Sequence, residues 1–323
     1  MKRNTRREFL RHGLFGAAAL WAGLKSPGVV SAVPDAKRTV DRRRLGRINT
    51  EVSILGLGLG TGMFWRPEPG SQTQEEFLHR GLDLGINYWD TCRSYPRSEV
   101  TIGPVVKQFR DRIFLVSKGN ERDYDGFHRE IDASLKALQT DHIDLYHLHD
   151  LRPTGDADLD EMEKGAVRAA RKAKEEGIIR NFGVTGHSGS RILIDAMRRF
   201  DPDAVLTIFP CTRPDNGRYE DELLPLAVER NMGMIAMKTV KQAKQAKLQG
   251  PELLRYALSL RGVHCVITGM NSMQELEENS TMAMGFQPLT KERRAEIHEH
   301  ARVALADTVA PWDQPGYRDG VPV

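Results

Sequence analysis

Short apolar runs alternate with amphipathic segments along most of this chain, and this alternation constrains the fold more than any other feature. It begins near Val52 and repeats eight times. Apolar runs separated by helical segments are typical of parallel strands joined by helices. We expect strands at residues 53–58, 86–90, 113–118, 143–149, 179–185, 204–209, 233–238 and 265–268. Eight such repeats predict an α/β fold of the closed (β/α)8 type, a TIM barrel, in a single domain.

An open, doubly wound sheet is the alternative architecture. A dinucleotide-binding sheet of that kind carries a G-x-G-x-x-G turn after an early strand, and no such turn follows the early strands here. Glycines instead alternate at the end of the first strand, at Gly56, Gly58, Gly60 and Gly62. This run favours close packing at a barrel rim over a nucleotide-binding loop.

We place the barrel at residues 33–289. Ahead of its first strand, residues 44–47 and 51–53 flank a short turn and predict a hairpin that closes the bottom of the barrel. Within the barrel, one covering helix is indicated by spacings of 4, 4 and 3 residues between Phe127, Ile131, Leu135 and Leu138. Residues 290–323 contain one helical stretch and then a coil with Pro and Gly, and we expect this C-terminal part to cover the barrel.

Residues 1–32 are typical of a targeting segment rather than of a folded element. A basic start precedes an apolar stretch at residues 14–24, which is short for a membrane span. Residues 5–11, Thr-Arg-Arg-Glu-Phe-Leu-Arg, resemble a twin-arginine signal peptide. Residues 30–32 form a candidate cleavage site. The sequence therefore predicts export by the twin-arginine machinery to the periplasm, without a stable membrane span once the signal is cleaved. An uncleaved anchor and a basic amphipathic helix are the alternatives.

Charge and cysteine content exclude several classes of protein. The formal net charge is +3, but residues 1–32 contribute +5, so the remainder carries −2. A body this close to neutrality, without a basic stripe, does not predict nucleic acid binding. Cys92, Cys211 and Cys265 are scattered and odd in number, so they form neither a disulfide framework nor a metal site, although one pair could still join in an oxidising compartment.

Charged and polar residues follow several of the apolar strands. Burial of such side chains costs free energy unless they are paired with a partner or serve a function. Asp90, Lys118, His149 and Lys238 each end a predicted strand, and Tyr95 lies five residues beyond Asp90. Barrel enzymes keep their active sites at the C-terminal ends of the strands. We therefore expect these side chains to share one site.

These residue types divide the work of acid–base catalysis. A phenol with a pKa near 10 needs a nearby cation to act at neutral pH, and Lys118 can supply it. Asp90 can hold that ammonium, and a neutral His149 can orient a carbonyl oxygen. The group suits protonation of an oxygen while hydride arrives at its carbon, with Tyr95 as the proton donor.

Several of these segments together resemble the aldo-keto reductase family, over residues 44–279. The similar stretches are residues 45–46 with 51–53, residues 85–92 with Tyr95 and residues 98–99, residues 117–118, and residues 143–149. The family's catalytic tetrad falls on Asp90, Tyr95, Lys118 and His149 without substitution. The resemblance implies a barrel with an extended nicotinamide cofactor that exchanges hydride with an aldehyde, ketone, sugar or alcohol.

The cofactor-binding segments depart from the family's pattern. Residues 267–279 resemble the adenosine-phosphate segment and keep Glu278 and Asn279, which contact adenine in the family. Gly269, Met270 and Glu275 stand where many members have Lys, Ser and Arg for the 2′-phosphate. Two lost cations and one gained carboxylate disfavour NADP(H). NADP(H), which the resemblance implies, and NAD(H) therefore both stay open.

Further cofactor contacts follow from the same resemblance. Ser272 could restore one hydrogen bond, and Lys238 could reach the phosphates, although a solvated rim position explains Lys238 equally well. In the amide-binding pocket, Thr185 and Gly186 replace the usual Ser and Asn, and Thr207 stands at the usual Gln. We expect all these residues near the cofactor.

Aromatic residues in loops suggest a substrate pocket, although surface packing explains them equally well. Trp65, Tyr124 and Trp312 lie in segments that could overhang the barrel mouth, together with Phe64 and Arg213. We interpret His187 as a residue of a helix entrance rather than a ligand.

Two other functions compete with the oxidoreductase. A non-catalytic barrel that binds a cofactor or ligand for sensing would explain the altered cofactor pocket, but not the intact tetrad. A metal-dependent hydrolase lacks a ligand cluster, because the closely spaced His147 and His149 have no carboxylate motif beside them. We therefore expect no metal.

Overall fold

The computed structural model describes residues 38–65, 72–153, 158–209, 219–314, 316–317 and 319. The twin-arginine segment, its cleavage site, Cys211 and Arg213 lie outside these residues. Residues from Arg38 onward form one compact unit. Among the described residues, no helix combines the length and the apolar character that crossing a bilayer requires.

Eight parallel strands close into a barrel in the described part of the chain. They are β3 (Leu55–Gly58), β4 (Tyr88–Asp90), β5 (Phe114–Gly119), β6 (Leu145–Leu148), β7 (Phe182–Gly186), β8 (Ala204–Ile208), β9 (Gly233–Met237) and β10 (Cys265–Thr268). The strand order runs β3 to β10 around the barrel, and β10 pairs with β3 to close it. The predicted (β/α)8 barrel is confirmed, and the doubly wound alternative is wrong.

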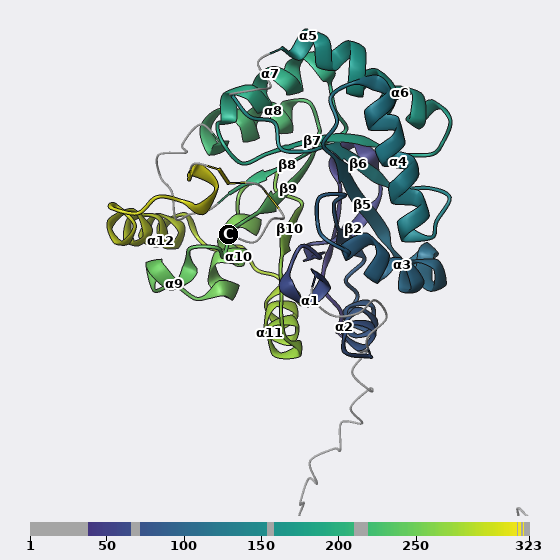
Figure 1. Ribbon diagram of the computed structural model, residues 1–323. Helices are drawn as coiled ribbons and strands as arrows, with labels where there is room; N and C mark the ends of the chain where they lie inside the picture. Colours follow the sequence, from purple (N-terminus) through teal and green to yellow (C-terminus); the bar gives the residue numbers. More distant parts are fainter. Residues whose placement is uncertain are drawn as a thin grey trace, which may run out of the picture. The chain divides into compact units, whose positions relative to one another are not determined.

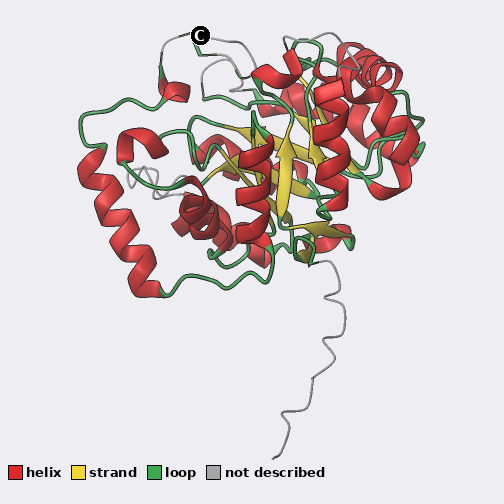
Figure 2. Ribbon diagram, turned by 90° about the horizontal axis from the view of Figure 1, so that it is seen from below, coloured by secondary structure: helices red, strands yellow, loops and turns green. Residues whose placement is uncertain are grey.

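Helices surround the strands on the outside, as Figures 1 and 2 show from two directions. They are α1 (Gly62–Trp65), α2 (Gln72–Asp83), α3 (Ser98–Phe109), α4 (Tyr124–Leu138), α5 (Leu159–Met162), α6 (Arg168–Glu175), α7 (Ser190–Phe200), α8 (Leu224–Glu229), α9 (Ala243–Ala246), α10 (Gly250–Leu258), α11 (Met273–Ala283) and α12 (Lys291–Ala304). Phe77 and Leu78 of α2 and Leu193 and Met197 of α7 are among the buried apolar residues with which these helices join the core.

Helix α4 illustrates how the local sequence builds this layer. The Asp123 carboxylate caps its first turn by accepting from the Gly126 amide over 2.8 Å, as N-caps do. Phe127 and Ile131 of its apolar stripe are fully buried, and the Phe127 ring meets Tyr146 of β6 edge to face at 5.5 Å. The helix thereby fixes the outer face of the strand that leads to His149.

A hairpin covers the N-terminal end of the barrel, as expected. Strands β1 (Arg42–Arg44) and β2 (Glu51–Ser53) pair antiparallel. Gly46, in the turn between them, has a φ of 48°, and a Cβ at this position would come within 2.6 Å of the Gly233 backbone nitrogen. Glycine is required there because the turn packs directly against the start of β9.

The C-terminal part returns to the opposite end of the barrel. After α12, the Trp312 side chain is buried, and the Trp312 carbonyl accepts a hydrogen bond from the Ser188 hydroxyl in the loop after β7 over 3.1 Å. Asp319 then enters the barrel mouth and contacts residues of several strand ends. The tail therefore lies where the C-terminal ends of the strands meet.

Candidate active site

Asp90 and Lys118 form a buried ion pair between neighbouring strands. The Lys118 ammonium donates to the Asp90 carboxylate over 2.5 Å and to the Thr91 carbonyl over 2.8 Å, and each paired side chain is 1% exposed. Burial raises the pKa of Asp90 despite the attraction of Lys118. The pair holds the ammonium at the floor of the barrel mouth.

Tyr95 lies over this ion pair, in the loop between β4 and α3. The Lys118 ammonium is 5.3 Å from the centre of the phenol ring, and the ring covers Gly60, where a Cβ would come within 2.6 Å of it. The Tyr95 hydroxyl donates to the Asp319 carboxylate over 2.8 Å. Burial, and then the negative charge of Asp319, raise the pKa of Tyr95 well above 10.

This pKa direction corrects the expectation that Lys118 would favour a phenolate in the ligand-free protein. The ammonium is already neutralised by Asp90, and a second carboxylate contacts the phenol itself. Tyr95 therefore holds its proton, as a proton donor requires.

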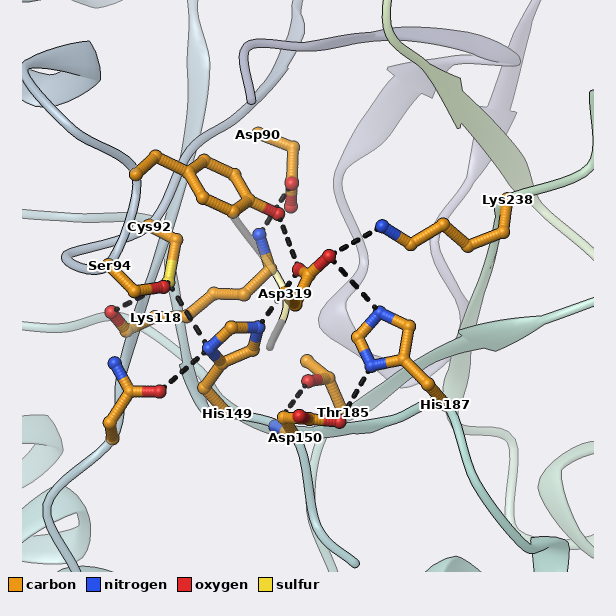
Figure 3. Close-up of polar contacts among 12 residues, drawn as sticks. Asp90, Cys92, Ser94, Lys118, His149, Asp150, Thr185, His187, Lys238 and Asp319 are labelled. Atoms are coloured by element: carbon orange, nitrogen blue, oxygen red, sulfur yellow. Dashed lines mark hydrogen bonds and ion pairs between the residues drawn. The ribbon is translucent and has the colours of Figure 1, made fainter. Parts of the chain in front are cut away.

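His149 follows β6 and turns its two ring nitrogens to different neighbours (Figure 3). Its Nε2 lies 3.2 Å from Oδ2 of Asp319, the same oxygen that accepts from Tyr95. Its Nδ1 lies 3.3 Å from the Cys92 sulfur and 2.9 Å from the side-chain amide oxygen of Asn120, a position that the amide NH2 takes when Nδ1 is an acceptor. Burial lowers the pKa of His149, so the ring is neutral at pH 7 and donates through Nε2–H when the Cys92 thiol donates to Nδ1.

The Asp319 carboxylate stands at the centre of these side chains in Figure 3. Its Oδ1 accepts from the Lys238 ammonium over 2.5 Å and from the Tyr317 hydroxyl over 3.0 Å. Its side chain is 3% exposed. Burial alone would raise the pKa of Asp319, but Lys238 and His187 outweigh it and hold the pKa well below 3.8. Asp319 is not among the site residues that the sequence predicts.

His187 also belongs to the site, contrary to its interpretation as part of a helix entrance. Helix α7 begins at Ser190, and His187 lies before it with a fully buried ring. Its Nδ1 is 2.6 Å from Asp150, and its Nε2 is 3.6 Å from Asp319. The hydrogen bond from His187 and its charge overcome burial and lower the pKa of Asp150 to about 2.

Lys238 points into the site rather than into solvent. It follows β9 with a φ of 59°, a left-handed conformation that is uncommon for a residue with a side chain. Its ammonium forms the ion pair with Asp319. The backbone turn therefore aims a cation at the barrel mouth, and the solvated rim interpretation of Lys238 is wrong.

A groove of about 440 Å³ runs beside Tyr95, between the ends of β3, β9 and β10. Lys238, Lys241, Gly58, Gly269 and Asn271 contribute to its walls. A Cβ at Gly269 would come within 2.3 Å of the Thr61 side chain, so glycine keeps this wall open. Two lysines and a side-chain-free wall suit an extended anionic ligand.

Other residues predicted to contact the cofactor are placed differently. Thr185, Gly186 and Thr207 are fully buried at the ends of β7 and β8. The Thr185 hydroxyl accepts from the Asp150 amide over 2.8 Å, and the Thr207 hydroxyl donates to the Gly186 carbonyl over 2.9 Å. Both hydroxyls therefore form hydrogen bonds with the backbone, on strands that β9 separates from β10.

The predicted adenosine segment forms the start of α11. The Ser272 hydroxyl caps the helix by accepting from the Glu275 amide over 3.1 Å, and the Glu275 carboxylate accepts from the Asn271 amide over 2.7 Å. This reciprocal arrangement resembles a capping box. Met270 is buried, whereas Glu278 is exposed and Asn279 half-buried on α11. Helix capping thus gives Ser272 and Glu275 a structural role.

The structure does not bring the predicted substrate-pocket aromatics together. Tyr124 opens α4, and its ring lies under the Arg168 guanidinium at 4.4 Å, in the outer helix layer. Its placement in the pocket was wrong, because its loop leads outward to α4. The Trp312 indole is buried in the hydrophobic core, with only its carbonyl bonded to the loop after β7. Trp65 ends α1, and its side chain lies outside what the structure describes.

Cys92 and Cys265 are buried free thiols, and burial raises the pKa of Cys92 to about 12. Within the described ranges, no three His, Cys, Asp or Glu side chains come together in an arrangement that could hold a metal ion.

Comparison with known proteins bears on the chemistry of this site. Residues 56–251 match the model of the aldo/keto reductase family. The oxidoreductase YqkF of Bacillus subtilis is 25% identical over 315 residues, covering 81% of this chain and 96% of that protein. The L-galactose dehydrogenase of Arabidopsis thaliana is 27% identical over 282 residues, covering 74% of this chain and 87% of that enzyme.

A solved structure shows the same similarity in three dimensions. An aldo-keto reductase from Pseudomonas aeruginosa superposes with a TM-score of 0.65 at 26% sequence identity. The match covers 76% of this chain and 96% of that one. These relatives are oxidoreductases, and they do not favour a non-catalytic barrel.

Proposed function

The chain belongs to the aldo/keto reductase family of oxidoreductases, and we propose that it transfers hydride between a nicotinamide dinucleotide and a carbonyl or alcohol carbon, with Tyr95 handling the proton. One observation carries this proposal. Two donors converge on a single oxygen, because Tyr95 Oη and His149 Nε2 lie 2.8 and 3.2 Å from Oδ2 of Asp319. A substrate oxygen at that point would receive both hydrogen bonds.

The four side chains then have distinct tasks. The nicotinamide, when bound, supplies or accepts the hydride. Tyr95 gives its hydroxyl proton to the carbonyl oxygen, while the Nε2–H of His149 holds that oxygen in place. The Lys118 ammonium, 5.3 Å from the ring centre, stabilises the phenolate that remains. Asp90 keeps the ammonium in position.

The groove beside Tyr95 is the proposed place of the cofactor. The Lys241 side chain in its wall suits the diphosphate, and its glycine wall leaves space for an extended chain. The Glu275 carboxylate lies on the segment that resembles the family's adenosine-phosphate segment, and it would repel a 2′-phosphate. We therefore favour NAD(H) over NADP(H), although the family resemblance by itself implies NADP(H).

The test of the activity uses the purified protein without its first 32 residues. Titration with NADH and NADPH, followed by nicotinamide fluorescence, measures cofactor binding. Turnover is measured on a generic aldehyde and on L-galactose, the sugar for which one relative is named. Tyr95→Phe should retain cofactor binding and lower kcat about 100-fold or more. Tyr124→Phe, which changes a phenol in the outer layer, should leave kcat unchanged.

Failure of the proposed function would be clear from the same titration. A folded, cofactor-free protein that binds neither dinucleotide does not transfer hydride. Equal turnover by Tyr95→Phe and the parent protein would assign the proton transfer to another group.

The N-terminal residues support a location for this activity. We propose export of the folded, cofactor-loaded enzyme to the periplasm through the twin-arginine route, since residues 5–11 resemble that signal. Changing Arg6 and Arg7 together to Lys should leave the protein in the cytoplasmic fraction. Changing Arg3 and Arg11 together to Lys alters two basic residues of the same segment and should not. Export of both variants alike would contradict the proposal.

A further inference from the structure

The Asp319 carboxylate occupies two distinct oxygen positions in the barrel mouth (Figure 3). Its Oδ2 is bound by Tyr95 and His149. Its Oδ1 is bound by Lys238 and Tyr317, with His187 3.6 Å away. The site therefore holds a carbon that bears two oxygen atoms, each with its own donors.

Asp319 cannot remain there while a substrate reacts. The proposed function places the reacting oxygen between Tyr95 and His149, and Oδ2 of Asp319 now fills that point. If Asp319 only anchored the C-terminal tail, its ion pair with Lys238 would be sufficient. A hydrogen bond with Tyr95, the proton donor of the proposed reaction, would not be needed. Substrate and Asp319 are therefore alternatives for one place.

The second oxygen position persists when the tail withdraws. Tyr317 is two residues from Asp319 and belongs to the same tail, so it leaves with it. Lys238 and His187 follow β9 and β7 and stay fixed to the barrel. Asp150 holds the His187 ring by its 2.6 Å contact. Withdrawal would leave the Lys238 cation without its carboxylate, so a ligand with an oxygen at that point is favoured over one without it.

We propose that the substrate carries a second oxygen on its reacting carbon, as a cyclic hemiacetal or an aldehyde hydrate does. In the ligand-free protein, the Asp319 carboxylate occupies the position of this substrate group. This inference rests on the proposed function. The reacting oxygen would lie between Tyr95 and His149, and the second oxygen would accept from Lys238. The planar O–C–O group of Asp319 corresponds to the lactone or acid that oxidation yields.

The oxidation balances with an oxidised nicotinamide dinucleotide as the acceptor. The carbon–hydrogen bond of the hemiacetal breaks, and its electron pair leaves as hydride to the nicotinamide. Withdrawal of the Asp319 carboxylate removes one cause of the raised pKa of Tyr95, so that Tyr95 can first release its own proton to solvent. The hydroxyl proton of the hemiacetal then passes to the Tyr95 phenolate, while the carbon–oxygen double bond of the lactone forms. A hemiacetal and oxidised cofactor thus give a lactone, reduced cofactor and one proton.

A first experiment tests the two-oxygen site without turnover. Acetate presents the same O–C–O group, and its binding can be followed by calorimetry and by NMR of labelled acetate. Asp319→Ala should bind acetate at least tenfold more tightly than the parent protein, because the internal carboxylate no longer competes. Asp307→Ala, which removes an exposed carboxylate of the same C-terminal part, should behave like the parent. Adding Lys238→Met to Asp319→Ala should abolish the gain.

A second experiment tests the substrate class with a matched pair of alcohols. 2-Hydroxytetrahydropyran and cyclohexanol share a six-membered ring, but only the former has an oxygen beside the reacting carbon. Lys238→Met should lower kcat/KM for the hemiacetal at least tenfold more than for cyclohexanol, since only the hemiacetal loses a hydrogen bond to a charged donor. The product from the hemiacetal should be δ-valerolactone.

If Asp319→Ala does not fold, Asp319→Asn provides the second variant, and it should lower KM for the hemiacetal.

Several results would overturn the inference. Equal losses for both alcohols would show that Lys238 serves only the cofactor. Absence of acetate binding by folded Asp319→Ala would show that no such site exists, and a raised KM in Asp319→Asn would make Asp319 a part of the working site. Oxidation of neither alcohol, with no reduction of a generic aldehyde, would defeat the proposed function and the redox step together. The acetate titration would still decide on the two-oxygen site.

Discussion

The Tyr95 hydroxyl and the Asp319 carboxylate are joined by a 2.8 Å hydrogen bond, although 224 positions separate them in the chain. A carboxylate beside a phenol stabilises the protonated phenol, because it repels the phenolate charge. Burial acts in the same direction. Asp319, in the C-terminal part of the chain, therefore helps to set the protonation state of the proposed proton donor.

The first prediction concerns the pH dependence of carbonyl reduction. The profile of kcat/KM reports ionisations of the free enzyme, in which Asp319 contacts Tyr95. Because the pKa of Tyr95 is raised above 10, the protonated donor persists through alkaline pH, and activity should fall only above pH 10. Asp319→Asn should move this fall to lower pH, because one cause of the raised pKa is removed. An unchanged alkaline limb in the variant would contradict the electrostatic role of Asp319.

The second prediction concerns the buried ion pair of Lys118 and Asp90. Lys118→Met leaves a carboxylate uncompensated in the barrel, which should lower the free energy of unfolding by about 3–5 kcal/mol. The double variant Asp90→Asn, Lys118→Met should recover much of this loss. Chemical denaturation measures all three proteins. Lys164→Met breaks the exposed pair with Glu161 and should change little, and a similar loss there would refute the burial argument.

Much of the barrel could be predicted because its signals are local. Each strand is an apolar run, and parallel strands bring their C-terminal ends to one mouth. Asp90 and Lys118 follow such runs on neighbouring strands, so their proximity follows from the strand order. The hairpin ahead of the barrel has the same local basis, in two short strands around a turn.

The rest of the site depends on contacts that leave no local signal. Asp319 lies in a coil beyond the last helix, and nothing in its surroundings indicates that the tail enters the mouth. His187 lies in the loop just ahead of α7, and its contacts with Asp150 and Asp319 join parts of the chain that are distant in sequence. The direction of Lys238 depends on its left-handed backbone, which its residue type does not predict.

The third prediction concerns the glycine beneath the proposed proton donor. A Cβ at Gly60 would come within 2.6–2.9 Å of the Tyr95 ring, so Gly60→Ala should displace the phenol. Misplacement of a catalytic group by about 1 Å can cost roughly 100-fold in rate, and we expect kcat/KM to fall by about 10- to 100-fold. Cofactor affinity should change less than the rate. Gly250→Ala meets only an ordinary 3.7 Å contact with Val240 and should retain full activity. Comparable losses in both variants would contradict this view.

The fourth prediction separates the structural and electrostatic roles of Glu275. Its carboxylate accepts from the Asn271 amide over 2.7 Å at the start of α11, and a glutamine at this position can still accept there. Glu275→Gln therefore keeps the helix start but removes the charge that would repel a 2′-phosphate. NADPH affinity should rise about tenfold, which corresponds to about 1.4 kcal/mol, while NADH affinity stays constant. Glu296→Gln on α12 is the control for a general loss of negative charge. Fluorescence titration measures each affinity. An unchanged NADPH affinity would assign Glu275 to helix capping alone, and an equal gain for both dinucleotides would contradict repulsion of the 2′-phosphate.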